Sequence, residues 1–267
     1  MKKIFVFAIA VFATLMISGC QKFLDVQPEG TPAAVGYFQS DQQAENAIKS
    51  IYAPMYDGDD GFGREIYWEQ TATCMFVVGK TKGWSSTLSK MVPSGDEDPL
   101  SGTYKLFYQI ISRANWIVDN LLEKSKTTEL TPIEKRSLGE AYFQRGFLHF
   151  MIAYRFGCKT QGVPAVKYEE YDGADYDIPQ QQPTVMDNYD MIIKDFEKAK
   201  EYLPRFETYS VAERGRAHEA AAVGMMARVY TYWAVYDSSK WDNVIACVNE
   251  LEKTYGRDLA PTNHKLF

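Results

Sequence analysis

The chain has 267 residues, of which 46% are apolar and 24% charged, so intrinsic disorder and a collagen-like structure are excluded. The net charge is −6 and no Lys/Arg-rich run is present, which argues against nucleic acid as a partner. Aromatic residues reach 14%, with 18 Tyr, 15 Phe and 5 Trp. One core of this size needs fewer rings, so we expect some of them to face solvent or a ligand.

The N-terminus has the pattern of a lipoprotein leader. Lys2 and Lys3 precede a 14-residue apolar run, Ile4 to Ile17, which as a helix would span about 21 Å and is too short for a bilayer core of about 30 Å. The next residues end in Ser18-Gly19-Cys20 and resemble a bacterial lipobox. We therefore predict a signal peptide over residues 1–19 and lipidation of Cys20; an ordinary signal peptide is the alternative.

The segment after Cys20 is predicted to be a tether. Residues 20–40 combine prolines and glycines with isolated apolar residues, a pattern typical of extended chain and not of a helix. Acyl chains on Cys20 would hold the protein at a membrane without spanning it. The remainder, residues 41–267, is predicted to form one helical domain.

Six helices are predicted in that domain from apolar residues at a spacing of three and four. Ser40 or Asp41 offers the first N-cap, Thr131-Pro132 opens the third helix before Gly157 ends it, and Thr184 caps the fourth. The predicted ranges are 41–54, 100–123, 132–156, 185–203, 217–236 and 241–255. Residues 56–99 and 157–183 are predicted to be long irregular loops, with short strand-like pieces at 74–78 and 163–166.

The last two predicted helices indicate how the domain is built. The helix over 217–236 begins with small residues and ends with large rings, and a four-residue turn joins it to the next helix. Small positions let a neighbouring helix approach closely, as in tetratricopeptide (TPR) pairs. The fold class predicted is therefore mainly α, a TPR-like helical-repeat scaffold with long irregular loops.

Several segments, taken in order, resemble the SusD/RagB family of nutrient-binding outer-membrane lipoproteins. They include the post-lipobox opening, part of the third helix with the turn after it, and the start of the fifth helix. The segments are 20–28, 141–157 with 163–164, 215–217, 227–230, 241, 259–261 and 266–267. Residues 158–162 lengthen a turn that is usually tighter in the family. The sequence resembles an N-terminal portion of a family member, since members continue well past this length.

The resemblance implies a function at the cell surface. A SusD-like lipoprotein sits on a SusC-like TonB-dependent transporter of the outer membrane and presents it with a glycan, or sometimes a peptide. The helical repeats form the transporter-facing scaffold, and the loops shape the ligand site. If the chain lacks a second half, apolar surfaces meant for that half are expected to be exposed and to favour association.

The first loop supplies the candidate ligand-binding residues. Tyr67, Trp68 and Trp84 are rings that could stack on the apolar face of a sugar, with Arg64 and Glu69 as hydroxyl partners. The alternative is that Tyr67 and Trp68 are packing anchors that hold the loop to the helices. The other three tryptophans, Trp116, Trp233 and Trp241, are expected to pack between helices.

Enzyme chemistry is not expected. Acidic residues are plentiful in the first loop, but no pair of them is singled out for glycoside hydrolysis, and no nucleophile or nucleotide-binding motif is present. The four cysteines and three histidines lack metal-ligand spacing, so neither a metal nor a cofactor is expected. The alternative function is a TPR-like scaffold lipoprotein that binds protein partners in the envelope.

Overall fold

A computed structural model describes residues 36–56, 62, 70–71, 73, 84–90, 100–165 and 180–258, without the side chains of 84–86 and 180. The chain divides into two compact units, residues 1–37 and 38–267. The second unit is mainly helical, as predicted. Its α-helices are α3 (Asp41–Tyr52), α5 (Trp84–Ser89), α6 (Leu100–Ser125), α7 (Pro132–Phe156), α8 (Val185–Tyr202), α9 (Glu219–Trp233) and α10 (Lys240–Tyr255).

Six of these helices were predicted, and the short α5 was not. The first long loop, predicted to be irregular, contains α5 in its described part. The second contains β1 (Pro164–Ala165), which pairs antiparallel with β2 (Gln180–Gln181), so the strand-like piece near Val163 is confirmed. The strand predicted at 74–78 lies outside the described residues. The 3-10 turns η1 (Ala53–Tyr56), η3 (Phe206–Thr208) and η4 (Val211–Glu213) complete the described elements.

The predicted N-caps of three helices are confirmed by their hydrogen bonds, whereas α3, α6 and α9 differ from their predicted bounds by two or three residues at one or both ends. Ser40 caps α3 through the backbone N–H of Gln43. Thr131 and Thr184 each form a reciprocal capping box, with Glu134 and Asp187 respectively. These polar side chains replace the intrahelical partners that the first N–H groups lack, which is why the helices begin at these residues.

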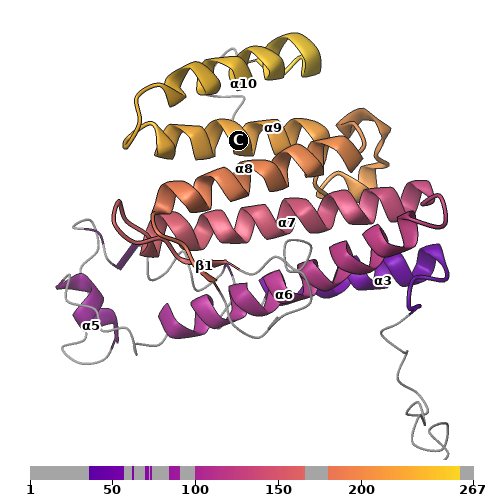
Figure 1. Cartoon of the computed structure of the whole chain (residues 1–267), viewed down its shortest axis with the longest axis horizontal. Coiled ribbons are helices and arrows are strands. Elements are labelled where there is room, and N and C mark those ends of the chain that lie inside the picture. The colour runs from indigo at the N-terminus through magenta and orange to yellow at the C-terminus, as the bar shows by residue number, and fades with distance from the viewer. Residues whose placement is uncertain are drawn as a thin grey trace, which may run out of the picture. The chain divides into compact units, whose positions relative to one another are not determined.

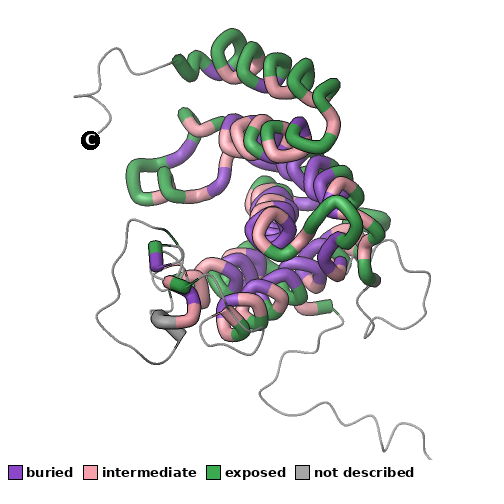
Figure 2. Tube along the Cα trace, turned by 90° about the vertical axis from the view of Figure 1, so that its left-hand side faces the viewer, coloured by how far each residue is buried: buried purple, intermediate pink, exposed green. Residues whose placement is uncertain are grey.

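Apart from the short α5, the helices of the second unit lie one after another in a stack (Figure 1). Helix α7 has α3 and α6 on one side and α8 on the other, and α9 and α10 follow in order. The buried surface is centred on α7, whereas most residues of α10 are exposed (Figure 2). Antiparallel neighbours joined by short turns are the arrangement expected of TPR-like helix pairs.

Close contact between α7 and α8 depends on a glycine. A Cβ atom built on Gly139 would lie 2.9 Å from the side chain and 2.9 Å from the backbone nitrogen of Leu203. Those distances are shorter than a van der Waals contact, so the end of α8 can lie against α7 only because position 139 has no side chain.

A fully buried ion pair joins the same two helices. The guanidinium of Arg145 donates to both carboxylate oxygens of Asp195, at 3.0 and 2.7 Å, and to Oδ1 of Asn115 on α6 at 2.8 Å. Arg145 and Asp195 are at most 1% exposed. The side chain of Arg145 therefore connects three consecutive helices, α6, α7 and α8.

A second polar cluster ties the segment before α9 to α3 and α7. Arg216 donates to Glu140 at 3.0 Å and to Glu45 at 2.6 Å, while Arg136 pairs with Glu45 and with Glu213 at 3.2 Å. Because Glu140 is fully buried, its carboxylate requires these cationic partners. The cluster therefore links α3, α7 and the segment before α9.

Candidate functional site

Most of the predicted site residues fall outside the described part of the chain. Cys20, Arg64, Tyr67, Trp68 and Glu69 all do so. Trp84 is the first residue of α5, and only its backbone is described. Their roles as lipid anchor and as candidate ligand-binding residues therefore stay predictions.

The described residues contain a different group of rings, gathered where α6 begins and α7 and α9 end. We call this group the aromatic end; it consists of Tyr104, Tyr154, Phe156, Tyr232 and Tyr236. These helix ends meet on one side of the stack, next to the β1–β2 hairpin (Figure 1). Phe156 is 43% exposed and Tyr236 37%, and the other three side chains are half-buried.

Ring contacts between helices hold the aromatic end in place. The rings of Tyr104 and Phe156 meet edge to face with centroids 5.3 Å apart, which connects α6 with α7. The rings of Tyr154 and Tyr232 lie 5.0 Å apart, which connects α7 with α9, and buried Phe150 contacts both. Tyr154 and Phe156 are two residues apart on α7 and therefore lie on different sides of that helix, so these are two separate ring contacts. Aromatic pairs at these separations add to the energy of burial.

Polar contacts position the neighbouring segments. The hydroxyl of Tyr108, one turn after Tyr104, donates to the carbonyl of Pro164 at 2.6 Å and so fixes β1 beside α6. Burial raises the pKa of Tyr108, so the hydroxyl stays protonated and can donate. The guanidinium of Arg155 lies 4.5 Å above the ring of Tyr154 and donates to the carbonyl of Met151 at 2.7 Å.

This arrangement can bind a ligand with alternating apolar and polar surfaces. A partly exposed ring presents an apolar face of the size of a pyranose ring, and Arg155 and the tyrosine hydroxyls supply hydrogen-bonding groups nearby. None of the five residues that define the aromatic end is Asp or Glu, so this group contains no pair of carboxylates. The chemistry available there is therefore stacking and hydrogen bonding.

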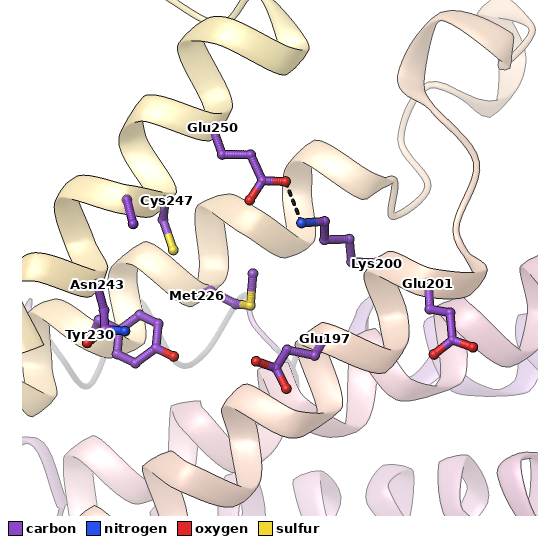
Figure 3. Close-up of a pocket in the computed structure, with 9 residues that line it drawn as sticks. Glu197, Lys200, Glu201, Met226, Tyr230, Asn243, Cys247 and Glu250 are labelled. Atoms are coloured by element: carbon purple, nitrogen blue, oxygen red, sulfur yellow. Dashed lines mark hydrogen bonds and ion pairs between the residues drawn. The ribbon is translucent and has the colours of Figure 1, made fainter.

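A polar groove lies elsewhere, between α8, α9 and α10 (Figure 3). Its volume is about 470 Å³, and Glu197, Lys200, Tyr230, Cys247 and Glu250 are among its lining residues. Lys200 and Glu250 pair across the groove, joining α8 to α10. Burial, with a contribution from Glu197, raises the pKa of Tyr230 to about 12, which keeps its hydroxyl protonated. The groove can hold a small polar group, but it has no exposed aromatic platform like that of the aromatic end.

The remaining tryptophans are only partly as predicted. Trp116 contacts Phe38, in the segment before α3, at a centroid distance of 5.3 Å. Trp233 lies between Tyr189 on α8 and Lys240 on α10, so it lies at a helix interface as expected. The prediction for Trp241 is wrong, because its side chain is 49% exposed on α10. Helical periodicity predicts that Trp241 belongs to a helix, but it does not predict whether another element packs against its side chain.

The aromatic end was not found from the sequence. Its residues belong to regular helical patterns, which favoured a packing role for them. The signal that could have found it is the clustering of rings at helix ends that adjoin both long loops: Tyr104 follows the first loop and Phe156 precedes the second. Sequence alone does not reveal that these ends meet in space.

Three further observations concern the described residues. They contain no group of His, Cys, Asp and Glu side chains that could hold a metal ion. Among the helices that the structure describes, none is both long enough and apolar enough to cross a membrane. Cys158 and Cys247, the described cysteines, are free thiols.

Comparison with known proteins places these features in context. Residues 22–231 match the profile of a SusD-like family described as starch-binding and associating with the outer membrane. A curated SusD-like protein from Bacteroides ovatus is 22% identical over 230 residues, which are 83% of this chain and 38% of that protein.

Solved structures agree on the fold. A SusD homologue from Bacteroides thetaiotaomicron has a TM-score of 0.68 at 19% identity, and the match covers 87% of this chain and 44% of that one. A laminarin-binding SusD-like protein has a TM-score of 0.65 at 20% identity, covering 84% and 47%. The predicted SusD-like helical fold is thus confirmed, and the chain spans less than half the length of these relatives.

Proposed function

The chain belongs to the SusD-like family described as starch-binding and associating with the outer membrane, and on this premise we propose that it is a cell-surface lipoprotein that binds oligosaccharide. We propose further that it delivers the bound glycan to a SusC-like TonB-dependent transporter. Binding without turnover is the activity expected. The observation that carries the proposal is the aromatic end, where the partly exposed rings of Phe156 and Tyr236 lie at the ends of α7 and α9 on a SusD-like fold.

The ligand class follows from the chemistry of these rings. Phe156 and Tyr236 are partly exposed to solvent, and sugar C–H groups stack on the faces of such rings while the sugar hydroxyls remain free to form hydrogen bonds. One structural relative is named as laminarin-binding and another as carbohydrate-binding, which supports the same class. The loop residues Tyr67, Trp68 and Trp84 remain proposed contributors to the site.

The location follows from the leader and the family. A lipidated Cys20 followed by a tether over residues 20–40 would hold the helical unit at the outer membrane, in agreement with the description of the family. The helical stack would then face the transporter while the loop side remains available to the glycan.

Glycan binding can be tested by affinity electrophoresis of the full chain through gels that contain different polysaccharides. We expect retardation by at least one polysaccharide, weakened in the Phe156→Ala and Tyr236→Ala variants. Tyr56→Ala is the matched control, because Tyr56 is an 87% exposed ring on η1, away from the aromatic end. Loss of retardation in the control, or no retardation by any polysaccharide or peptide, would contradict the proposal.

Transporter delivery and the absence of turnover need separate measurements. Cross-linking in intact cells, followed by purification, should recover a TonB-dependent receptor. Incubation with the retained polysaccharide should release no reducing ends. Release of product would indicate an enzyme instead.

The polar groove favours one other function, a scaffold that binds protein partners. TPR-like helices commonly bind peptides along their grooves. The carboxylate of exposed Glu197 lines the groove between α8 and α10, where it could accept hydrogen bonds from a peptide. Recovery of envelope proteins without a transporter, together with no glycan retention, would favour this function over the proposed one.

A further inference from the structure

The helix segments that carry the aromatic end contain no carboxylate. Residues 100–118 of α6, 141–156 of α7 and 220–236 include neither Asp nor Glu, although the whole chain has a net charge of −6. The charged residues of these segments are all basic: Lys105, Arg113, Arg145, Arg155 and Arg228. These parts of an acidic protein are therefore basic.

One of the four arginines differs from the others in what it contacts. Arg145 is buried in its ion pair, and Arg113 donates to a backbone carbonyl of α3 at 2.7 Å. Arg155 donates to a carbonyl of its own helix at 2.7 Å. Arg228, by contrast, is exposed, and it forms no ion pair with a carboxylate of the described residues.

Arg228 lies at one end of a row of rings on α9. Its guanidinium carbon is 5.8 Å from the ring centroid of Phe150, and Phe150 contacts both Tyr154 and Tyr232. Tyr232 follows Arg228 by four residues, about one helical turn, so the two side chains share a face of α9. Tyr236 comes four residues later, just after the helix ends. At ~1.5 Å per residue, this row extends over roughly 12 Å.

The carboxylates on the neighbouring elements are already paired. At the start of α8, Asp187 is held by the capping box, and Asp190 pairs with the lysine one turn later at 2.8 Å. After α9, Asp237 accepts from the N–H and the hydroxyl of Ser239 at 3.0 and 2.7 Å. Asp237 also lies at the end of the row opposite to Arg228. The guanidinium of Arg228 can therefore pair with an anion from outside the chain.

We propose that the aromatic end selects a glycan with an anionic substituent, a carboxylate or a sulfate, which pairs with Arg228 while the sugar rings lie along Tyr232 and Tyr236. This selectivity rests on the proposed glycan binding and adds the class of substrate. A guanidinium presents parallel N–H donors that match two oxygens of either anion. A neutral glycan offers no charge to pair with them, so the charge of the glycan should decide its affinity.

Isothermal titration calorimetry of the full chain in detergent, with matched oligosaccharides, measures this selectivity. Hexagalacturonate and its methyl ester differ in the carboxylate charge, and sulfated and unmodified maltohexaose differ in the sulfate. We expect the anionic member of at least one pair to bind at least about tenfold more tightly, because hydrogen bonds to charged groups are the stronger ones. The pair that shows this preference identifies the anion, and added salt should reduce it.

Substitution of Arg228 tests the residue itself. Arg228→Gln should weaken binding of the anionic oligosaccharide by about tenfold and of the neutral one by less than about twofold, whereas Arg228→Lys should keep part of the preference because the charge remains. Arg214→Gln is the matched control. Arg214 is also exposed, and its guanidinium carbon lies 5.7 Å from the ring of Phe206, before the start of α9. The same loss of charge there should leave the preference unchanged.

The outcomes separate this selectivity from glycan binding itself. Equal affinity within both pairs, or a preference that Arg228→Gln and Arg214→Gln reduce equally, would overturn the anionic selectivity. Retention by neutral polysaccharides alone would also overturn it and would leave glycan binding intact. Failure of every polysaccharide to retard the chain in affinity gels would instead overturn glycan binding. Far-UV circular dichroism of Arg228→Gln should match that of the parent chain, so that lost affinity is not lost folding.

Discussion

Removal of one partner of the Arg145–Asp195 pair should be among the most destabilising changes in the helical stack. In the Asp195→Ala variant, the guanidinium of Arg145 keeps its charge but loses the two hydrogen bonds of 2.7 and 3.0 Å to the carboxylate. Arg145 is fully buried, so water cannot replace them without opening the contact between α7 and α8.

The magnitude follows from the cost of an uncompensated buried charge. Breaking such a pair on one side costs about 3–5 kcal/mol. For a unit of this size, each kcal/mol lowers Tm by roughly 2–4 °C, so the variant should melt about 6–20 °C below the parent chain. In the Arg145→Met/Asp195→Leu double variant no charge stays buried, and the remaining cost should be about 1–3 kcal/mol because Asn115 loses a hydrogen-bond donor.

Urea unfolding of the full chain, followed by far-UV circular dichroism, measures these free energies. Glu201→Ala is the control, since Glu201 pairs with Lys198 at 2.8 Å but both side chains are more than half exposed. The control should cost less than about 1 kcal/mol. The reasoning is refuted if Asp195→Ala costs no more than the control, or if the double variant costs as much as the two single variants added together.

Two further predictions concern backbone packing and pH. Gly139→Ala should destabilise the chain by about 1–3 kcal/mol because the added Cβ would meet Leu203. Gly224→Ala on α9 should stabilise it by about 0.5–1 kcal/mol, since no atom lies within 4 Å of the added Cβ. Thermal melts that rank the two variants in the opposite order would contradict the packing argument. His218 caps α9 by accepting from the N–H of Ala221 at 3.1 Å, and burial together with Arg257 lowers its pKa below the usual 6.5. The neutral His218 cap therefore stabilises the fold fully above about pH 6.5, and this contribution is lost as the pH falls through the lowered pKa. The His218→Asn variant keeps a capping side chain that does not titrate, so its Tm should depend less on pH in that window. An unchanged pH profile of Tm would argue against the role of His218.

The sequence by itself determined where most helices begin and end. Ser40, Thr131 and Thr184 act on N–H groups within three residues, and Pro204 follows the end of α8 because proline cannot continue a helix. These signals are local, so a pattern of a few residues suffices to recognise them. The SusD-like family could also be identified from ordered sequence segments, since the comparisons confirm it.

The candidate site was far less predictable. The sequence indicated a surplus of rings but not which ones are exposed, and of the five loop residues chosen from it only Trp84 is described, by its backbone alone. Tyr104, Phe156 and Tyr232 come from three helices that are distant in sequence, and only the packing of those helices brings their rings together. For Trp241 the sequence correctly predicted a place on the last helix, but the predicted packing between helices is wrong, because the side chain is exposed.

Tertiary structure alone decided the long-range pairings. Arg145 finds Asp195 fifty residues later, and Arg216 reaches Glu45 across 171 positions of sequence. Neither pair has a spacing signal, because their partners meet through the order in which helices stack and not through the period of any one helix. Local hydrogen bonding fixes the elements, whereas burial of their apolar faces against one another fixes which charges pair, which rings remain exposed and which helix face stays open.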